Sequence, residues 1–269
     1  MRAGLYSKGM PYERELAFAR RAAALAGENA RRLRSSGLST ETKPDCSPVT
    51  AADRDNERLL CELIAAEFPD DGILGEEGTE HSGRSGRRWI LDPIDGTRDF
   101  VRGNRFWCVL IALEDQDQSA VGVAHFPMLD ETYWAARGCG AFRNGDRLRV
   151  SAVDRIESAV ISANALNEIS GQPYAPAMFD YLSRFWAVRS FGGGLDAMLL
   201  AAGQIDVWIE PKCKVWDLAP LQVIIEEAGG RFFALDGSCR IDRGNAVACT
   251  PALEPEVRRF FGIPGGSIA

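Results

Sequence analysis

The stretch WILDPIDGTRDF, residues 89–100, decides the fold. An apolar run leads into Asp92 and Asp95, which are three residues apart with Pro93 between them, and a Gly-Thr pair follows. A residue before proline is pushed towards extended backbone, so we expect Asp92 to end a strand and Pro93 to begin a turn that brings Asp95 back beside it. Two adjacent carboxylates repel each other unless a cation lies between them. The stretch therefore predicts either a cation site or an ordinary surface turn held by Asx hydrogen bonds.

The donors available in this stretch are oxygen atoms. The main-chain carbonyl of Ile94 lies in the same turn as the two carboxylates, and the whole chain has only two histidines, His81 and His125. A site built on several imidazoles is excluded by that count. Hard oxygen ligands without imidazole or thiolate suit Mg²⁺, which also keeps several waters. The backbone N–H groups around Gly96 and Thr97 could receive an anion at the start of a helix.

Other acidic residues stand at the predicted ends of elements. Glu76 and Glu77 follow a short apolar strand in LGEEG, Asp217 follows VW at a predicted helix start, and Asp53 closes PVTAAD. Each has an ordinary structural interpretation: Glu77 as a solvated turn residue, and Asp53 and Asp217 as helix caps. Acidic residues at four separate element ends, two of them just after a tryptophan, favour one shared site over independent caps.

Composition limits the classes of function. The chain has 269 residues, 46% of them hydrophobic, and a net charge of −7, which argues against nucleic-acid binding because that needs a concentrated basic face. Seven scattered cysteines without a CxxC pair predict reduced thiols. The first 21 residues contain no long apolar segment, and no run approaches a membrane span. We therefore expect a cytoplasmic protein with no nucleic-acid or membrane partner.

The hydrophobic pattern predicts two packed lobes. Helices are expected over residues 11–34 and 51–68, a flexible connector over 81–87, and then mostly antiparallel strands, with a type I′ hairpin turn at Asn144-Gly145. After residue 151 strands and helices alternate. The predicted division is an α+β lobe over residues 1–150, whose antiparallel sheet carries most of the expected ligands, and an α/β lobe over residues 151–269, which carries Asp217 and the residues that choose the substrate.

Three segments in this order, GEE, WILDPIDGTRDF and VWDLAPLQVIIEEAGG, resemble the inositol monophosphatase family of Mg²⁺-dependent, lithium-sensitive phosphatases. KPDCSPVTAAD is similar to the segment that precedes GEE in that family, so the resemblance covers about residues 43–230. It implies an α+β / α/β fold, the layered α-β-α-β-α sandwich of the inositol monophosphatase and fructose-1,6-bisphosphatase type, and a homodimer.

The resemblance also implies a role for each matched residue. Two or three Mg²⁺ ions are expected, with Mn²⁺ as a substitute and Li⁺ as an inhibitor. Their implied ligands are Glu76, Asp92, the carbonyl of Ile94, Asp95 and Asp217, and Glu77 is a catalytic-site carboxylate beside them. The N–H groups of Gly96 and Thr97 would bind phosphate. Thr97 and Asp53 would orient and deprotonate the attacking water, and no phosphoenzyme is expected.

The substrate is expected to be a small phosphorylated metabolite, bound mainly by the second lobe. DFVRG, residues 99–103, resembles the NFVRG of bacterial histidinol-phosphate phosphatases, and YWAARGCGAF and LQVIIEEAGGRF are also closer to that branch. Glu210, seven residues before Asp217, matches a carboxylate that contacts substrate in these enzymes. Among the possible substrates we expect L-histidinol phosphate, an intermediate of histidine biosynthesis. The alternatives are inositol 1-phosphate, fructose 1,6-bisphosphate and adenosine 3′,5′-bisphosphate, or a catalytically inactive ligand-binding protein on the same fold.

One departure from that branch lies in FGGG, residues 191–194. Histidinol-phosphate enzymes of this kind usually carry an aspartate at the position of Gly193. Gly193, Gly194 and Asp196 are therefore candidate substrate residues, and the sequence leaves open whether Asp196 replaces the missing aspartate. Arg102 could approach the substrate, a neighbouring subunit or only solvent.

Overall fold

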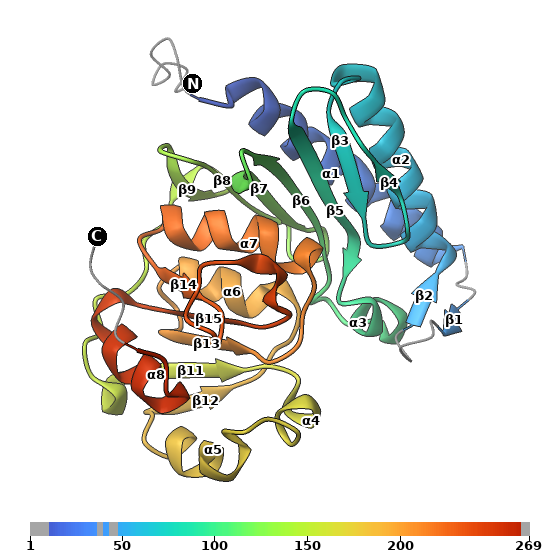
Figure 1. The fold of residues 1–269 in the computed structure, drawn as a ribbon. Helices are drawn as coiled ribbons and strands as arrows, with labels where there is room; N and C mark the ends of the chain where they lie inside the picture. The colour runs from blue at the N-terminus through green and yellow to red at the C-terminus, as the bar shows by residue number, and fades with distance from the viewer. Residues whose placement is uncertain (1–10, 37–39, 43–47, 265–269) are drawn as a thin grey trace.

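The computed structural model describes residues 11–36, 40–42 and 48–264, and its elements stack in five alternating layers of helix and sheet (Figure 1). The first sheet has eight strands in the order β10-β9-β8-β7-β6-β5-β3-β4. All neighbouring strands are antiparallel except β3 and β5, which are parallel. The strands are β3 Gly72–Gly75, β4 Glu80–His81, β5 Arg87–Asp95, β6 Cys108–Asp115, β7 Gln118–Phe126, β8 Glu131–Ala136, β9 Gly140–Arg143 and β10 Asp146–Arg147.

The two faces of this sheet are covered by helices, which explains why its central strands are apolar on both sides. In β6 the first six residues are all buried. The helices α1 (Glu13–Ser35) and α2 (Ala51–Glu67) cover the outer face (Figure 1). The buried side of α1 is rich in alanine, and a Cβ on Gly27 would lie 2.7 Å from His125 of β7, so small residues allow this helix to lie close to the sheet.

The inner face is covered by α6 (Gly194–Ala201) and α7 (Val215–Glu227), which lie between the two sheets (Figure 1). Because α7 is buried from both sides, its apolar residues surround it and form no single stripe. The second sheet has the order β12-β11-β13-β15-β14. Its strands are β11 Val160–Ala163, β12 Ala187–Arg189, β13 Val207–Glu210, β14 Arg231–Phe233 and β15 Ala246–Cys249.

The outermost layer on the second sheet contains α4 (Leu166–Ile169), α5 (Ala175–Leu182) and α8 (Glu254–Phe261) (Figure 1). The remaining elements are the ribbon of β1 (Thr40–Thr42) and β2 (Pro48–Thr50), the short helix α3 (Thr97–Arg102), and 3₁₀ turns at Ile156–Ser158, Ile241–Arg243 and Pro251–Leu253. No helix within the described ranges is both long enough and apolar enough to span a bilayer.

The predicted layered sandwich is confirmed, as are the two long N-terminal helices and the hairpin turn, where Asn144 and Gly145 both have positive φ. Two short helices, α4 and α5, were not predicted; α4 lies in residues 164–173, whose Asn, Ser, Gly and Pro suggest a loop. The connector predicted over residues 81–87 is in part wrong, since His81 pairs with Ile73 in a two-residue strand. The two-lobe division near residue 150 stays a prediction, and that position falls between the last strand of one sheet and the first of the other.

Candidate metal and phosphate site

The geometry of the DPID segment comes from a bulge in β5. The strand does not end at Asp92 as predicted; it continues to Asp95, and its register against β6 shifts between Asp92↔Leu110 and Asp95↔Cys108. Residues three apart in a regular strand point to opposite faces. Here three steps along β5 oppose two along β6, and this extra residue turns both aspartates to the same side. Proline within a sheet is confined largely to such places, because it cannot donate to the ladder.

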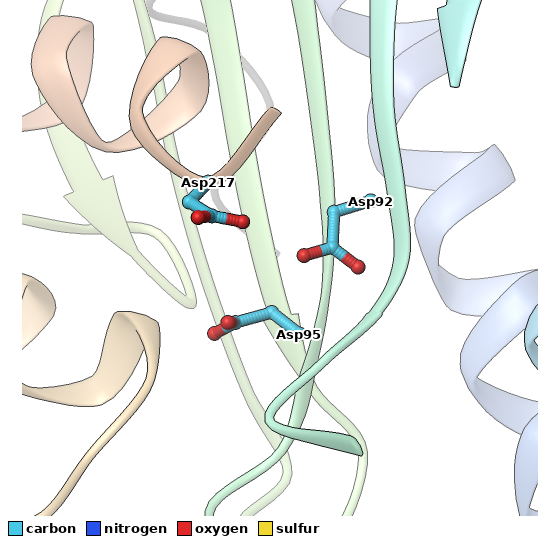
Figure 2. A group of neighbouring side chains, drawn as sticks. All are labelled: Asp92, Asp95 and Asp217. Carbon is cyan, nitrogen blue, oxygen red and sulfur yellow. The ribbon is translucent and has the colours of Figure 1, made fainter. Parts of the chain in front are cut away.

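A third carboxylate completes the group. Asp217 lies in the first turn of α7, and the side chains of Asp92, Asp95 and Asp217 point into one space between β5 and the start of that helix (Figure 2). One oxygen from each lies within 4.8 Å of one from each of the others. The donor set consists of carboxylates, which fits a hard divalent cation such as Mg²⁺.

The electrostatics of the group favour a cation as well. Burial raises the pKa of Asp92 well above its ordinary value, and the charges of Glu76, Asp95 and Asp217 raise it further. Burial also raises the pKa of Asp217 to about 8 and that of Asp95 to about 6, although in the latter the Gly194 N–H opposes the change. Without positive charge these groups therefore keep their protons to a higher pH than an exposed aspartate does, whereas a bound cation would favour their ionised forms.

The loop that carries Glu76 and Glu77 is held by a residue that the sequence reasoning missed. Glu57 of α2 is 3% exposed and accepts hydrogen bonds from the backbone N–H of Glu77 at 2.7 Å and of Thr79 at 2.9 Å. Glu76 lines the same cavity as the three aspartates, whereas Glu77 is not among its lining residues. The sequence contains a pattern that indicates a buried Glu57, because residues 53, 57, 60 and 64 form one helical face that mixes acidic and apolar side chains.

Thr97 connects the cavity to a buried carboxylate. Its Oγ1 lies 3.3 Å from Asp53 Oδ1 and 3.1 Å from the carbonyl oxygen of Ile94, so its proton can be donated to either. The other oxygen of Asp53 accepts from the backbone N–H of Thr50 at 2.8 Å, which completes a capping box at the start of α2. Burial raises the pKa of Asp53, and the hydrogen bonds from Thr50 oppose that change.

The loop over residues 191–194 passes very close to Asp95. The Gly194 N–H donates to Asp95 Oδ2 at 2.5 Å, and a Cβ on Gly193 would lie only 2.8 Å from the same oxygen. Asp196 is 0% exposed and accepts from the backbone N–H of Gly192 at 2.8 Å and from Ser162 Oγ at 2.7 Å. In this position Asp196 supports the loop from behind and does not line the cavity.

The cavity in front of these residues has a volume of about 500 Å³. Glu210, at the end of β13, lines it, and burial raises the pKa of this carboxyl to about 8. Its Oε2 accepts from the side-chain amide of Asn164 at 3.0 Å. Of the residues expected from the sequence, the cavity brings together Glu76, Asp92, Ile94, Asp95, Gly96, Thr97, Gly193, Gly194, Glu210 and Asp217. Asp53 reaches it through Thr97, and Arg102 is exposed and does not line it.

Comparisons with known proteins agree with this geometry. Residues 12–258 match the inositol monophosphatase family. The chain is 41% identical over 225 residues to a histidinol-phosphatase of Mycobacterium tuberculosis, covering 82% of this chain and 86% of the relative. It is 34% identical to an inositol-1-monophosphatase of Rhizobium meliloti, covering 79% and 81% of the two chains. The crystal structure of the extragenic suppressor protein SuhB from Bartonella henselae superposes with a TM-score of 0.85 at 31% identity, covering 93% of this chain and 98% of that one.

Proposed function

The chain belongs to the inositol monophosphatase family and is a phosphatase, and we propose that it is a Mg²⁺-dependent phosphate monoester hydrolase whose substrate is L-histidinol phosphate. The observation that carries the reaction type is the group of three carboxylates at one end of a cavity large enough for a small ester. The substrate rests on the similarity to histidinol-phosphatases and on the acidic cavity wall at Glu210.

In the proposed mechanism Asp92, Asp95 and Asp217 would hold Mg²⁺, together with Glu76 and the Ile94 carbonyl, and Mn²⁺ would substitute while Li⁺ would inhibit. Bound Mg²⁺, in two or three copies, would neutralise the phosphate dianion, acidify water and stabilise the leaving alkoxide. The backbone N–H groups of Gly96 and Thr97, at the start of α3, receive phosphate oxygens. Phosphoryl transfer depends mainly on such positioning and charge stabilisation.

Thr97 and Asp53 orient the attacking water and take its proton. The Thr97 hydroxyl accepts a hydrogen bond from the water while it donates its own to Asp53, which lies 3.3 Å away. A base whose pKa lies above that of an exposed aspartate accepts a proton more readily, and burial provides this shift in Asp53. No side chain of the site needs to form a covalent phosphoenzyme, because water is the nucleophile.

The departing alcohol is placed against Glu210. The Glu210 carboxylate can accept hydrogen bonds from the ammonium group of histidinol, and equally from the hydroxyls of inositol. Inositol 1-phosphate is therefore the second candidate, favoured by Gly193, which stands where histidinol-phosphate enzymes usually have an aspartate. We place the enzyme in the cytoplasm, since each of the six cysteines within the described ranges is a free thiol. The homodimer is proposed from the membership of the inositol monophosphatase family.

A steady-state panel tests the proposal. Phosphate release is measured with L-histidinol phosphate, myo-inositol 1-phosphate, fructose 1,6-bisphosphate and adenosine 3′,5′-bisphosphate, each with Mg²⁺ and with EDTA. We expect activity only with the metal and the highest kcat/KM for L-histidinol phosphate. A higher kcat/KM for any other ester would overturn the substrate, and full activity in EDTA would overturn the metal dependence.

A further inference from the structure

Two carboxylates in the cavity are held in the same unusual way. Asp99 of α3 accepts from the side-chain amide of Asn104 at 2.7 Å, and Glu210 of β13 accepts from that of Asn164 at 3.0 Å. Both line the cavity, and neither forms an ion pair with any residue in the described ranges. A neutral amide fixes one oxygen of each carboxylate, but it does not neutralise the charge. Buried or half-buried carboxylates are normally paired with a cation.

Three cationic side chains within the described ranges also line the cavity, and none of them forms an ion pair with Asp99 or Glu210. Two of them are Arg98 and Lys214, the residue directly before α7. Lys212 forms an ion pair with Glu168 at 3.3 Å. Asp99 and Glu210 therefore have no cationic side chain as a partner within the described ranges, and a cation bound beside Glu210 would favour its ionised form.

The loop opposite Asp99 cannot supply a carboxylate of its own. Gly193 has φ +56° and ψ −160°, a combination essentially restricted to glycine, and a Cβ there would lie 2.8 Å from Asp95 Oδ2. An aspartate at this position would collide with a metal ligand. At the neighbouring residue, a Cβ on Gly192 would lie 3.8 Å from Asp99 Oδ2. The oxygen of Asp99 that Asn104 does not hold therefore faces the same part of the cavity that this loop borders.

We propose that Asp99 is a specificity-determining residue which, together with Glu210, binds the ammonium group of a cationic leaving alcohol. The inference rests on the proposed function and deepens it, because it assigns the recognition of the amine to α3 instead of the 191–194 loop. Asn104 and Asn164 are positioning residues that aim the two carboxylates. The metal end of the cavity binds the dianionic phosphate, and Asp99 and Glu210 bind the positive end of the same molecule.

The test compares L-histidinol phosphate with its des-amino analogue, 3-(imidazol-4-yl)propyl phosphate, which lacks only the ammonium group. The isosteric variant Asp99→Asn keeps an acceptor for Asn104 and removes only the charge. We expect it to lower the ratio of the two kcat/KM values by about tenfold, mainly through a higher KM for L-histidinol phosphate, as the loss of one hydrogen bond between charged groups would. Asp99→Glu, which retains the charge, should keep a higher ratio than Asp99→Asn.

Asp154→Asn is the matched control, because Asp154 is exposed and does not line the cavity, and its ratio should stay within about twofold of the wild type. Binding of free L-histidinol, measured by calorimetry, should weaken in Asp99→Asn by about tenfold as well. An unchanged ratio and unchanged binding in a folded Asp99→Asn protein would overturn the inference while leaving the proposed function intact. A wild-type enzyme that fails to hydrolyse L-histidinol phosphate would overturn the proposed function itself.

Discussion

Replacing Gly193 by alanine tests whether the close approach of the 191–194 loop to Asp95 is needed for catalysis. The added Cβ would lie 2.8 Å from Asp95 Oδ2, a separation that cannot be maintained, so either the loop or the aspartate must move. The backbone conformation, φ +56° and ψ −160°, adds a cost of about 1–3 kcal/mol for a residue other than glycine.

The catalytic loss should exceed what the strain alone would cause. Gly194, the next residue, donates to Asp95 Oδ2 at 2.5 Å, so a shift of the loop breaks this hydrogen bond and displaces a proposed metal ligand. A displacement of about 1 Å in a catalytic group can lower the rate by about 100-fold. We therefore expect Gly193→Ala to lower kcat/KM by about 100-fold and to raise the Mg²⁺ concentration required for half-maximal activity.

The assay is phosphate release across a Mg²⁺ titration, paired with thermal unfolding. The control is Gly262→Ala, because Gly262 has φ +69° and no atom within 4 Å of its added Cβ. This control carries backbone strain without a clash, so it should unfold at a lower temperature and keep its activity and Mg²⁺ requirement. If Gly193→Ala shows the kcat/KM and Mg²⁺ requirement of the wild type, the reasoning about this loop is refuted.

Substitutions at three residues and one titration test the rest of the site. Asp95→Asn should keep the fold by circular dichroism and lose at least about 100-fold in Mg²⁺-dependent turnover. Changing a residue that only hydrogen-bonds to a metal ligand already costs about 10–100-fold, and Asp95 is proposed to be a ligand itself. Near-normal turnover would rule out that role. Thr97→Val should lose about 100-fold or more in kcat and Thr97→Ser should recover most of it, because only the hydroxyl can pass a proton to Asp53; equal rates in both would contradict the relay. Glu57→Ala should lower the free energy of unfolding in urea by about 3 kcal/mol, because two backbone N–H groups lose a charged acceptor. An unchanged urea midpoint would argue that Glu57 does not hold this loop. Without metal the pKa of Asp217 is raised to about 8, so its protonated form stabilises the fold, and this contribution is lost as the pH rises from about 4 through 8. The Tm in EDTA should therefore fall between pH 5.5 and 8.5, and Mg²⁺ should restore it most at the upper end. A Tm that does not change with pH would contradict the burial of this charge.

Those parts of the site that depend on residues close together in the chain could be predicted from the sequence. Adjacent carboxylates, a proline and a Gly-Thr pair can be interpreted over six residues, and the expected gathering of Asp92, Asp95 and Asp217 follows from the ends of elements. The bulge in β5 was not predictable in this way, because it is defined by register against Leu110 and Cys108 on another strand. The strand was therefore predicted to end three residues too early.

Roles that depend on burial were also beyond the sequence. Asp196 was a candidate to contact substrate, yet it lies behind the loop with no exposed surface, because α6 turns it towards Ser162 of the second sheet. Nothing in the sequence indicated a role for Asn164, which directly follows β11. Its contact with Glu210, 46 residues away at the end of β13, depends on the parallel pairing of these two strands. Pairing between distant strands brings such side chains together, and hydrophobic periodicity does not specify it.

The two interpretations weighed for the acidic residues, helix cap or functional site, are not exclusive. In each of the four aspartates of the site one oxygen accepts from a backbone N–H: Asp53 from Thr50, Asp92 from Ile94, Asp95 from Gly194 and Asp217 from Lys214. These hydrogen bonds fix the rotation of each carboxylate and offset part of its desolvation. The carboxylate then points in a defined direction, towards the space shared by Asp92, Asp95 and Asp217 or towards Thr97. Capping of α2 and α7 is thus part of how the fold aims its carboxylates, and asparagine at these positions should preserve much of the fold while removing the charge that the reaction requires.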